Sequence, residues 1–321
     1  MTKPQAFALS DLSGPNLNAK ILVTNKALQP AIEHIKHRFA IHFLEDYLED
    51  TQGELPEITG LLSSGWDIVD KPLLDRLPNL EVISHLANGL DAIDMDVTES
   101  RNIALHNTPN AVVNDTADLA LAFVLNLSRR VLFNHRFVED GKWGKMPYPL
   151  GQTLTGKTVG IVGLGKIGKA IAKRCQAFDM QIHYWGRNDQ KLNGYEFHAD
   201  LTQLAKRVDY LIISCAGNDQ TRGIINQDVL AQLKPTAFVI NVARGFVVDQ
   251  NALIQALDDK RIAGAGLDVF EQEPNVPDAL LHRDNLMLQP HAGSATEETR
   301  AYMFWQVANH LVNYFQHKDK S

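Results

Sequence analysis

The chain has 321 residues, a formal net charge of −7, 45% hydrophobic residues and 21% charged residues. This length exceeds what one hydrophobic core usually holds, so the sequence predicts two domains in an ordinary globular protein. The acidic balance and the lack of a lysine- and arginine-rich run argue against nucleic-acid binding.

No apolar stretch reaches the length of a membrane span, and Met1–Lys20 is polar with no apolar leader segment, so we expect no membrane partner. The cysteines, Cys175 and Cys215, cannot build a disulfide framework and have no metal-ligand spacing. We interpret both as small core residues. The sequence therefore predicts a cytoplasmic protein without a metal site.

The first third of the chain alternates short apolar runs with helix-like stretches. Strands are expected at residues 21–23, 41–44, 60–62, 82–84 and 103–105, and a helix near 28–37. This alternation predicts a small βα domain with a parallel sheet. The turn residues of Asn107–Asn110 end the pattern.

A long helix is predicted next, with Asn114 or Asp115 as its cap. Ala117, Phe123 and Leu127 are among the residues that make it apolar on most faces. Such a helix requires burial on several sides, as at a domain junction or a subunit interface. Residues 139–152, which contain glycine, proline and aromatic residues, are expected to form an irregular loop.

A second βα series begins at Lys157. Its strands are expected at residues 158–162, 182–185, 210–214, 237–241, 265–269 and 286–289. Six strands with intervening helices match the doubly wound dinucleotide fold. A last helix, Glu297–Phe315, is expected to return to the first domain.

The fold class expected is α/β, with two Rossmann-like doubly wound parallel-sheet domains. The first is discontinuous and comprises residues 1–113 and 297–321, a substrate-binding, flavodoxin-like domain. The second, residues 114–296, is an NAD(P)-binding Rossmann domain.

Three polar residues each follow a predicted strand of the second sheet: Arg244, Glu273 and His291. Parallel strands place such residues outside one carboxyl edge, where open α/β folds bind ligands. An arginine clamps a carboxylate, and a His–Glu pair delivers a proton to a carbonyl oxygen. Each residue alone has an ordinary explanation, as an ion-pair partner, a turn cap or a surface imidazole. Together they favour a site that reduces 2-keto acids.

The segment Gly163-x-Gly165-x-x-Gly168 follows an apolar strand and opens a helix, which is the context of a dinucleotide fingerprint. Gly163 permits a tight turn, Gly165 lets a pyrophosphate approach the backbone, and Gly168 lets the helix pack closely. The N–H groups at the helix start hold the phosphate charge.

The next strand end distinguishes the two nicotinamide cofactors. NAD enzymes carry an acidic residue about 20 positions past the glycines, whereas an arginine accommodates a 2′-phosphate. Here Gly186 fills the acidic position and Arg187 follows it. Asp189 and Asp200 lie nearby and weigh against this interpretation. We expect NADPH as the preferred cofactor, with NADH possible.

These motifs together resemble the D-2-hydroxyacid dehydrogenases from about Lys20 onward. The likeness rests on Leu154–Gly165, Asn241–Gly245 with Val248–Asp249 and Ala252–Leu253, Gly266–Phe270, Glu273–Pro274 and Pro290–His291. Within that family the chain is most similar to NADPH-dependent glyoxylate/hydroxypyruvate and hydroxyphenylpyruvate reductases. That closer likeness rests on Gly141–Trp143, Tyr184–Arg187 and Glu273–Pro277.

The resemblance implies a role for each matching residue. His291 is the expected general acid, Glu273 its partner, and Arg244 the ligand of the substrate carboxylate and keto oxygen. Asp268 is expected to hold the nicotinamide end, with the capping of a turn as the alternative. Expected substrate-binding residues are Asn88, Gly89, Arg244, His291 and Ser294. Expected cofactor-binding residues are Gly163, Leu164, Gly165, Lys166, Ile167, Gly168, Gly186, Arg187, Asn188, Ala216, Thr221, Val242, Ala243, Asp268 and Gly293.

Two positions depart from the family pattern. Asn88 replaces a small or apolar residue, and Ala216–Asn218 replaces a turn that usually contains proline. The resemblance also implies a homodimer, in which Trp143 either faces a neighbouring active site or packs within its own loop.

The expected activity is NADPH-dependent reduction of glyoxylate, hydroxypyruvate or other small 2-keto acids to D-2-hydroxy acids. Alternatives are a reductase for bulkier keto acids such as hydroxyphenylpyruvate, a non-enzymatic dinucleotide-sensing protein on the same fold, and a formate or phosphite dehydrogenase. A formate enzyme would pair its histidine with glutamine, whereas residue 273 is a glutamate.

Overall fold

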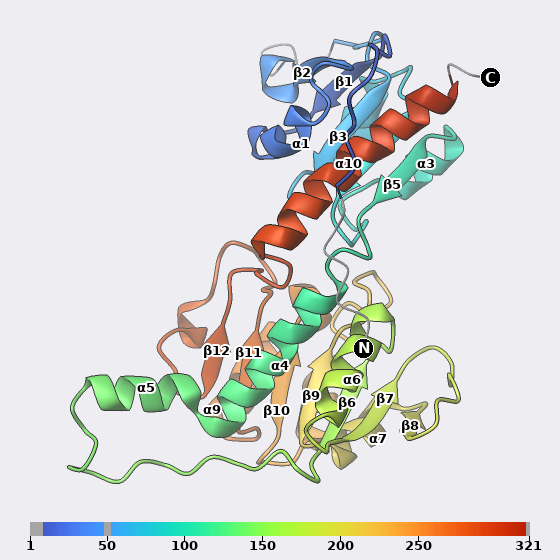
Figure 1. Ribbon diagram of the computed structural model, residues 1–321. Helices are drawn as coiled ribbons and strands as arrows, with labels where there is room; N and C mark the ends of the chain where they lie inside the picture. Colours follow the sequence, from blue (N-terminus) through green and yellow to red (C-terminus); the bar gives the residue numbers. More distant parts are fainter. Residues whose placement is uncertain (1–8, 48–52, 319–321) are drawn as a thin grey trace. The chain divides into compact units, whose positions relative to one another are not determined.

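The computed structural model describes residues 9–47 and 53–318, so the start of the polar N-terminal segment lies outside the described residues. The chain divides into two compact units (Figure 1). Unit 1 comprises Met1–Val112 and Thr296–Ser321, and unit 2 comprises Val113–Ala295. Within the described ranges, no helix is both long and apolar enough to cross a membrane.

Unit 1 is built on a parallel sheet of five strands with the order β2-β1-β3-β4-β5. This is the flavodoxin-like strand order. The five strands predicted from the apolar runs are all present, with small shifts in their ends. They are β1 (Lys20–Val23), β2 (Ala40–Phe43), β3 (Gly60–Ser64), β4 (Val82–Leu86) and β5 (Ala104–Asn107).

The C-terminal helix α10 (Glu297–Lys318) belongs to unit 1 and packs on β4 and on α1 (Gln29–Glu33). The hydroxyl of Ser84 donates a hydrogen bond to the carbonyl of Val307 at 2.9 Å, which ties strand to helix. The unit also contains α2 (Lys71–Asp75), α3 (Met95–Ser100) and the short 3₁₀ helices η1 (Lys26–Leu28) and η2 (Leu44–Tyr47).

The helix predicted near residues 28–37 is shorter than expected. It is α1, which ends at Glu33. Beyond it the chain tightens into i→i+3 bonds, such as Arg38 N–H to the Ile35 carbonyl at 2.8 Å. The buried Arg38 side chain then donates to the carbonyls of Leu12 and Pro15, which draws the chain away from the helix axis.

Unit 2 contains a parallel sheet with the order β12-β11-β10-β9-β6-β7-β8. The six predicted strands are confirmed, but the prediction missed a seventh, the edge strand β8. The strands are β6 (Thr158–Val162), β7 (Gln181–Trp185), β8 (Tyr195–His198), β9 (Tyr210–Ile213), β10 (Phe238–Asn241), β11 (Gly264–Leu267) and β12 (Leu286–Leu288). The strand order reverses between β6 and β9, which makes this the place where doubly wound sheets bind a dinucleotide.

Helices cover both faces of this sheet (Figure 1). They are α4 (Val113–Arg129), α6 (Lys166–Gln176), α7 (Leu201–Arg207), α8 (Gln227–Gln232) and α9 (Gln250–Asp258). The unit also contains α5 (Val131–Glu139), which packs on α4, and the 3₁₀ helices η3 (Gly245–Val247) and η4 (Asp278–Leu280). Residues 140–157 form turns and extended chain, which confirms the predicted irregular loop.

The long helix α4 is buried as its composition required. Ala117, Ala120 and Phe123 are fully buried against α6 and the β10–β12 half of the sheet. The Phe123 ring lies so close to Gly266 of β11 that a Cβ there would come within 2.7 Å of it. The predicted cap was wrong, because the helix begins at Val113 and both Asn114 and Asp115 lie in its first turn. An acidic residue in that turn stabilises the positive end of the helix dipole.

The two cysteines are core residues, as predicted. Cys175 is buried in α6 and Cys215 is half-buried after β9. Burial raises the pKa of the Cys175 thiol to about 12 and that of Cys215 to about 11. Neither thiol is therefore an active nucleophile at neutral pH.

Candidate active site

Three polar residues gather at one edge of the unit 2 sheet because each follows the carboxyl end of a neighbouring strand. Arg244 follows β10, Asp268 directly follows β11, and His291 follows β12. These strands are paired in parallel, with Asn241 opposite Leu267 and Leu267 opposite Leu288. Consecutive parallel strands thus place an arginine, a carboxylate and an imidazole along one edge.

Asp268 holds the turn that carries the imidazole. One of its carboxylate oxygens accepts the Ala292 N–H at 2.6 Å and the other accepts the Gly293 N–H at 2.9 Å. The Asp268 carbonyl accepts the His291 N–H at 2.8 Å. These three bonds keep His291 in the left-handed region at φ 55°, which side chains rarely adopt.

A side chain at position 293 of this turn would crowd Asp268. A Cβ there would come within 2.9 Å of the Asp268 carboxylate. Burial raises the pKa of Asp268, and the charge of Glu273 adds to this, while the two backbone hydrogen bonds and His291 lower it in part. The side chain therefore acts as a cap for the turn, the alternative considered from the sequence, and its role toward the nicotinamide stays a prediction.

Glu273 and His291 form a hydrogen-bonded pair. The Nδ1 atom of His291 lies 2.7 Å from Oε2 of Glu273. Oε1 of the same carboxylate accepts the Phe270 N–H at 3.0 Å, which fixes the orientation of the carboxylate. With Nδ1 committed to Glu273, the Nε2 side of the ring is the side that can exchange a proton with a bound molecule.

Several charges act on Glu273. Burial by itself would raise the pKa of Glu273, but the hydrogen bond and charge of His291 lower it. The Phe270 N–H and the charge of Arg244 lower it further, so the pKa of this carboxyl lies below its ordinary value of 4.5. A carboxyl with a lowered pKa stabilises the folded state above its ordinary pKa and loses this contribution as the pH falls through the lowered value. The Glu273 carboxylate is therefore ionised at neutral pH and accepts a hydrogen bond there.

Arg244 is positioned by residues to which the sequence assigned no role. The buried side chain of Asn241 accepts the Ala243 N–H at 3.0 Å and donates to the Arg244 carbonyl at 2.9 Å. Gly217 borders the arginine side chain so closely that a Cβ would come within 2.6 Å of its Cγ. Gly245 approaches the Phe270 backbone in the same way, which brings the arginine segment next to the Glu273 segment.

Two features of the sequence indicate these positioning residues, although weakly. An asparagine that ends a buried strand commonly bonds to the backbone two residues later. The replacement of the expected proline turn by Ala216–Asn218 placed a glycine where a side chain would meet Arg244. Neither feature shows which residue Asn241 or Gly217 contacts, because these contacts depend on the fold.

The glycine turn has the geometry that its sequence predicted. Gly163 adopts φ +92°, and a Cβ there would come within 2.5 Å of the Cys215 backbone. A Cβ at Gly168 would come within 2.3 Å of the Gly163 carbonyl oxygen, so α6 packs closely on the turn. By contrast, nothing lies within 4 Å of a Cβ built on Gly165, the N-cap residue of α6. This residue is therefore open to a ligand at the start of the helix.

The segment after β7 presents a glycine and an exposed arginine. Gly186 also has nothing within 4 Å of a built Cβ, and Arg187 is exposed. The Asp189 carboxylate accepts hydrogen bonds from the Tyr184 hydroxyl and from the Lys191 N–H, at 2.7 and 2.8 Å. Asp200 caps α7. Both acidic residues that weighed against NADPH thus accept hydrogen bonds from residues close to them in the sequence.

The predicted carboxylate-binding turn lies in unit 1, directly after β4. Asn88 is exposed, and its carbonyl accepts a hydrogen bond from the Asn107 side chain at 2.9 Å. The Thr108 N–H bonds to the Ala87 carbonyl, also at 2.9 Å. These bonds hold the Asn88–Gly89 turn at the carboxyl edge of the unit 1 sheet, and its role toward a substrate stays a prediction.

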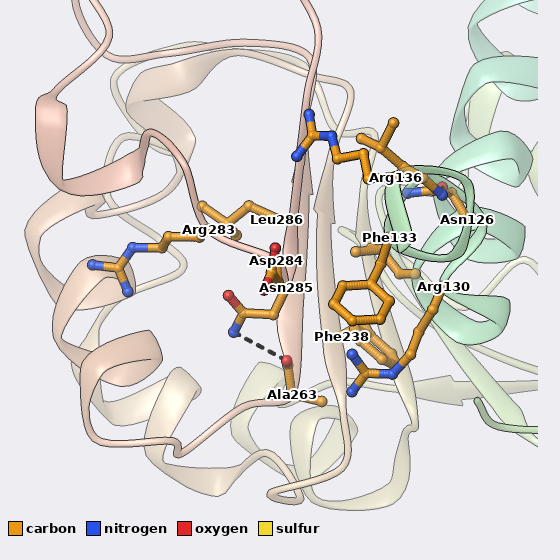
Figure 2. Close-up of a pocket in the computed structure, with 12 residues that line it drawn as sticks. Asn126, Arg130, Phe133, Arg136, Phe238, Ala263, Arg283, Asp284, Asn285 and Leu286 are labelled. Atoms are coloured by element: carbon orange, nitrogen blue, oxygen red, sulfur yellow. Dashed lines mark hydrogen bonds between the residues drawn. The ribbon is translucent and has the colours of Figure 1, made fainter. Parts of the chain in front are cut away.

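A separate cavity lies at the opposite edge of the unit 2 sheet (Figure 2). Phe238 begins β10, while Ala263 and Asn285 precede β11 and β12, so these lining residues mark the amino edge. Asn285 donates a hydrogen bond to the Ala263 carbonyl at 3.2 Å. The cavity does not include the arginine, glutamate or histidine described above.

The comparisons with known proteins identify the family of this chain. The family model of the NAD-binding domain of D-isomer specific 2-hydroxyacid dehydrogenases matches residues 121–293, more than half of the chain. The chain belongs to the D-2-hydroxyacid dehydrogenase family. The family predicted from the sequence is thereby confirmed, and the matched residues include Arg244, Glu273 and His291.

Similar members of the family are named as reductases. The chain is 41% identical to the 2-ketogluconate reductase of Gluconobacter oxydans, over 92% of this chain and 96% of the relative. It is 40% identical to the glyoxylate/hydroxypyruvate reductase A of Arabidopsis thaliana, over 84% and 86%. The fold matches the NADPH-dependent glyoxylate/hydroxypyruvate reductase of Sinorhizobium meliloti, solved with NADP and malonate, with a TM-score of 0.85, 36% identity and coverage of 93% and 94%. The chain is thus an oxidoreductase of this dehydrogenase family, acting on CH–OH donors.

The Glu273–His291 pair predicts a specific effect of Glu273→Gln. This change keeps the side-chain length but removes the negative charge beside the His291 ring, so we expect kcat of the dehydrogenase reaction to fall by about 10²-fold. The lowered pKa keeps the native carboxylate charged through the acidic range, so the deficit should persist from about pH 5 to pH 8 in steady-state assays.

The exposed neighbour Glu271 offers a matched control. The Glu271→Gln variant should retain the kcat of the native enzyme across the same pH range. Equal activity of the Glu273→Gln and Glu271→Gln enzymes would show that the charge of the pair does not contribute to turnover.

Proposed function

We propose that this enzyme uses NADPH to reduce small 2-keto acids to D-2-hydroxy acids. The observation that carries the proposal is the 2.7 Å pair of His291 and Glu273, with the charge of Arg244 acting on the same carboxylate. A proton donor and an anion-binding cation beside the carboxyl edge of a dinucleotide fold are what this reaction requires.

The glycine turn fits a dinucleotide cofactor. Gly165 is open at the start of α6, where backbone N–H groups and the helix dipole favour a pyrophosphate. We propose that this turn holds the pyrophosphate and that Asp268 and Gly293 border the nicotinamide. The bound cofactor supplies the hydride. The protein aligns the two reactants and provides the proton.

The proposed roles of the side chains follow from their geometry. Arg244 offers a guanidinium that binds a carboxylate in two-point fashion. His291 holds a proton on Nε2 and delivers it to the keto oxygen as negative charge develops there, while Glu273 stabilises the positive ring. We further propose that the N–H groups of Asn88 and Gly89, and the side chain of Ser294, bind substrate.

We propose NADPH over NADH because of the segment after β7. Arg187 is exposed beside Gly186, and an arginine in this segment accommodates a 2′-phosphate. The hydrogen bonds of Asp189 to Tyr184 and Lys191 commit its carboxylate to the loop, so it is not required as a ribose ligand. The similar enzyme of Sinorhizobium meliloti is described as NADPH-dependent.

The relatives define the range of substrates worth testing. Similar enzymes are named for glyoxylate and hydroxypyruvate, for hydroxyphenylpyruvate and for 2-ketogluconate. We favour the small keto acids, with hydroxyphenylpyruvate as the bulkier alternative. A steady-state panel of these four compounds with NADPH and NADH would rank them by kcat/KM, and a preference for the aryl compound would overturn the favoured substrate class.

We also propose that the enzyme is a cytoplasmic homodimer. Most of the exposed large apolar residues of unit 2 lie on α5 or in the segment that follows it. Val138 is 54% exposed, Trp143 is 74% exposed and Leu150 is 83% exposed, and apolar surface of this kind marks a protein interface. A mass measurement in solution tests the oligomeric state.

The general-acid role predicts the outcome of His291→Asn. Asparagine cannot carry the transferred proton, so we expect keto-acid reduction to fall by about 10³-fold or more, while NADPH still binds to the glycine turn. NADPH oxidation with glyoxylate measures turnover, and fluorescence of the bound cofactor measures binding. Activity equal to that of the native enzyme would overturn the proposed function.

The cofactor preference predicts the outcome of Arg187→Ala. Loss of a charge-assisted bond to a phosphate costs about 1.5–3 kcal/mol, so the KM for NADPH should rise by roughly tenfold or more, with a much smaller change for NADH. Lys206→Ala removes an exposed cation on α7 and serves as the control. An equal effect of Arg187→Ala on both cofactors would remove the argument for NADPH.

A further inference from the structure

Two imidazoles and a carboxylate converge at the far end of the unit 2 sheet from the catalytic residues. His183 lies on β7, and Glu196 and His198 lie on β8. The sheet order places β7 and β8 at one end and β12, which precedes His291, at the other. The proposed reduction uses none of these three side chains.

The strand register brings the three side chains onto one face of the sheet. His183 is paired with Glu196. Two positions further along the strands, Trp185 is paired with His198. Since alternate residues of a strand face the same side, His183, Glu196 and His198 share a face. The opposite face carries Ile182 and Tyr184, which are buried in the core against α6.

The ligand atoms of the three side chains lie within 4.8 Å of one another. Nδ1 of His183 is 2.9 Å from Nε2 of His198. Nε2 of His198 is also 3.4 Å from Oε1 of Glu196, and Nε2 of His183 is 3.5 Å from Oε2. The two rings are nearly parallel, at 18°, with centroids 5.1 Å apart.

The ligand atoms are close to the separation that the ligands of one metal ion have. Nitrogen and oxygen ligands about 2.0–2.2 Å from Zn²⁺ lie about 3.3–3.5 Å from each other in a tetrahedral site. The two carboxylate–imidazole distances already have this value. The two nitrogens of His183 face different partners, with Nδ1 2.9 Å from His198 and Nε2 3.5 Å from Glu196, so the His183 ring must turn to direct one nitrogen at a shared ion. The two imidazole nitrogens must also separate by a few tenths of an ångström.

A hydrogen bond between the rings accounts for only part of the arrangement. Nε2 of His198 is approached both by His183 and by Glu196. One imidazole nitrogen offers either one N–H or one lone pair, so it satisfies one of these neighbours and not both. A cation among the three groups would accept a lone pair from each of them.

Burial gives the cluster an inner and an outer side. The imidazole side chains are 12% and 11% exposed, whereas Glu196 is 59% exposed. An ion held by the two rings would therefore meet solvent through the carboxylate side, where water completes its coordination. Two neutral imidazoles and a carboxylate are a ligand set that Zn²⁺ prefers.

We propose that His183, Glu196 and His198 bind a divalent transition-metal ion, Zn²⁺ by ligand preference, in a site separate from the hydride-transfer machinery. The ion joins the edge strand β8 to β7, directly before the Gly186–Arg187 segment. The positive charges of Arg207 and Lys234 also act on His183, and Lys234 is ion-paired with Asp209 at 2.9 Å. These cations oppose a bound dication, so we expect micromolar rather than nanomolar affinity.

The test is a metal titration of tag-free protein that has been stripped with a chelator. Calorimetry with ZnCl₂ should show one site of micromolar affinity per chain, and CoCl₂ should produce the visible absorption of a nitrogen- and oxygen-ligated ion. Zn²⁺ should also raise the melting temperature, since it binds the folded state alone.

Single substitutions locate the site. His198→Gln and the more conservative Glu196→Gln should each weaken Zn²⁺ binding by about tenfold or more, with far-UV circular dichroism confirming the fold. His135→Gln is the matched control, because His135 and Glu139 form an exposed pair at 3.3 Å without a second imidazole. It should leave the affinity unchanged.

The same titration in the His291→Asn background separates this site from the catalytic pair. Binding that persists there and is lost in Glu196→Gln and His198→Gln supports the proposal. The absence of binding at millimolar Zn²⁺, native affinity in both cluster variants, or binding lost only in His291→Asn would each overturn it. The experiment does not use turnover, so its failure is distinct from a failure of the proposed reductase function.

Discussion

The chemistry at the edge of the unit 2 sheet depends on the buried carboxylate of Asp268, which accepts the N–H groups of Ala292 and Gly293. These bonds join the end of β11 to the turn after β12. They keep His291 in a left-handed backbone conformation. The free-energy cost of this conformation is offset by the hydrogen bonds of the turn. The imidazole therefore projects from a rigid turn, although it lies in a segment without regular secondary structure.

Glu273 connects the remaining charged groups. Its two carboxylate oxygens are committed to different partners, the imidazole of His291 and the backbone of Phe270. The Phe270 backbone is in turn the surface against which Gly245 packs, directly after Arg244. The cation, the carboxylate and the imidazole are thus linked through backbone contacts, and charge compensation at Glu273 holds the set together.

Much of this arrangement was predictable because residues that follow neighbouring parallel strands must share an edge of the sheet. Arg244, Glu273 and His291 could be placed from the apolar runs before them, and the glycine turn from its spacing. The bonds of Asp268 to residues 24 and 25 positions away could not be placed, since they depend on the paired register of β11 and β12.

The edge strand β8 was missed for a related reason. Tyr195–His198 is four residues long and lacks the apolar run that identified the buried strands. Its pairing with β7 creates the alternating pattern of faces, and no spacing within the sequence shows that His183 will lie beside Glu196. The cluster of imidazoles is a product of tertiary structure alone.

The strand order of unit 2 has an evolutionary consequence. Arg244, Glu273 and His291 follow β10, β11 and β12, whereas the Gly186–Arg187 segment follows β7, on the other side of the glycine turn. Substitutions at well-separated positions without shared partners usually have additive effects. A lineage can therefore change the Gly186–Arg187 segment without disturbing the arrangement of Arg244, Glu273 and His291, and this modularity lets the two parts of one sheet vary independently.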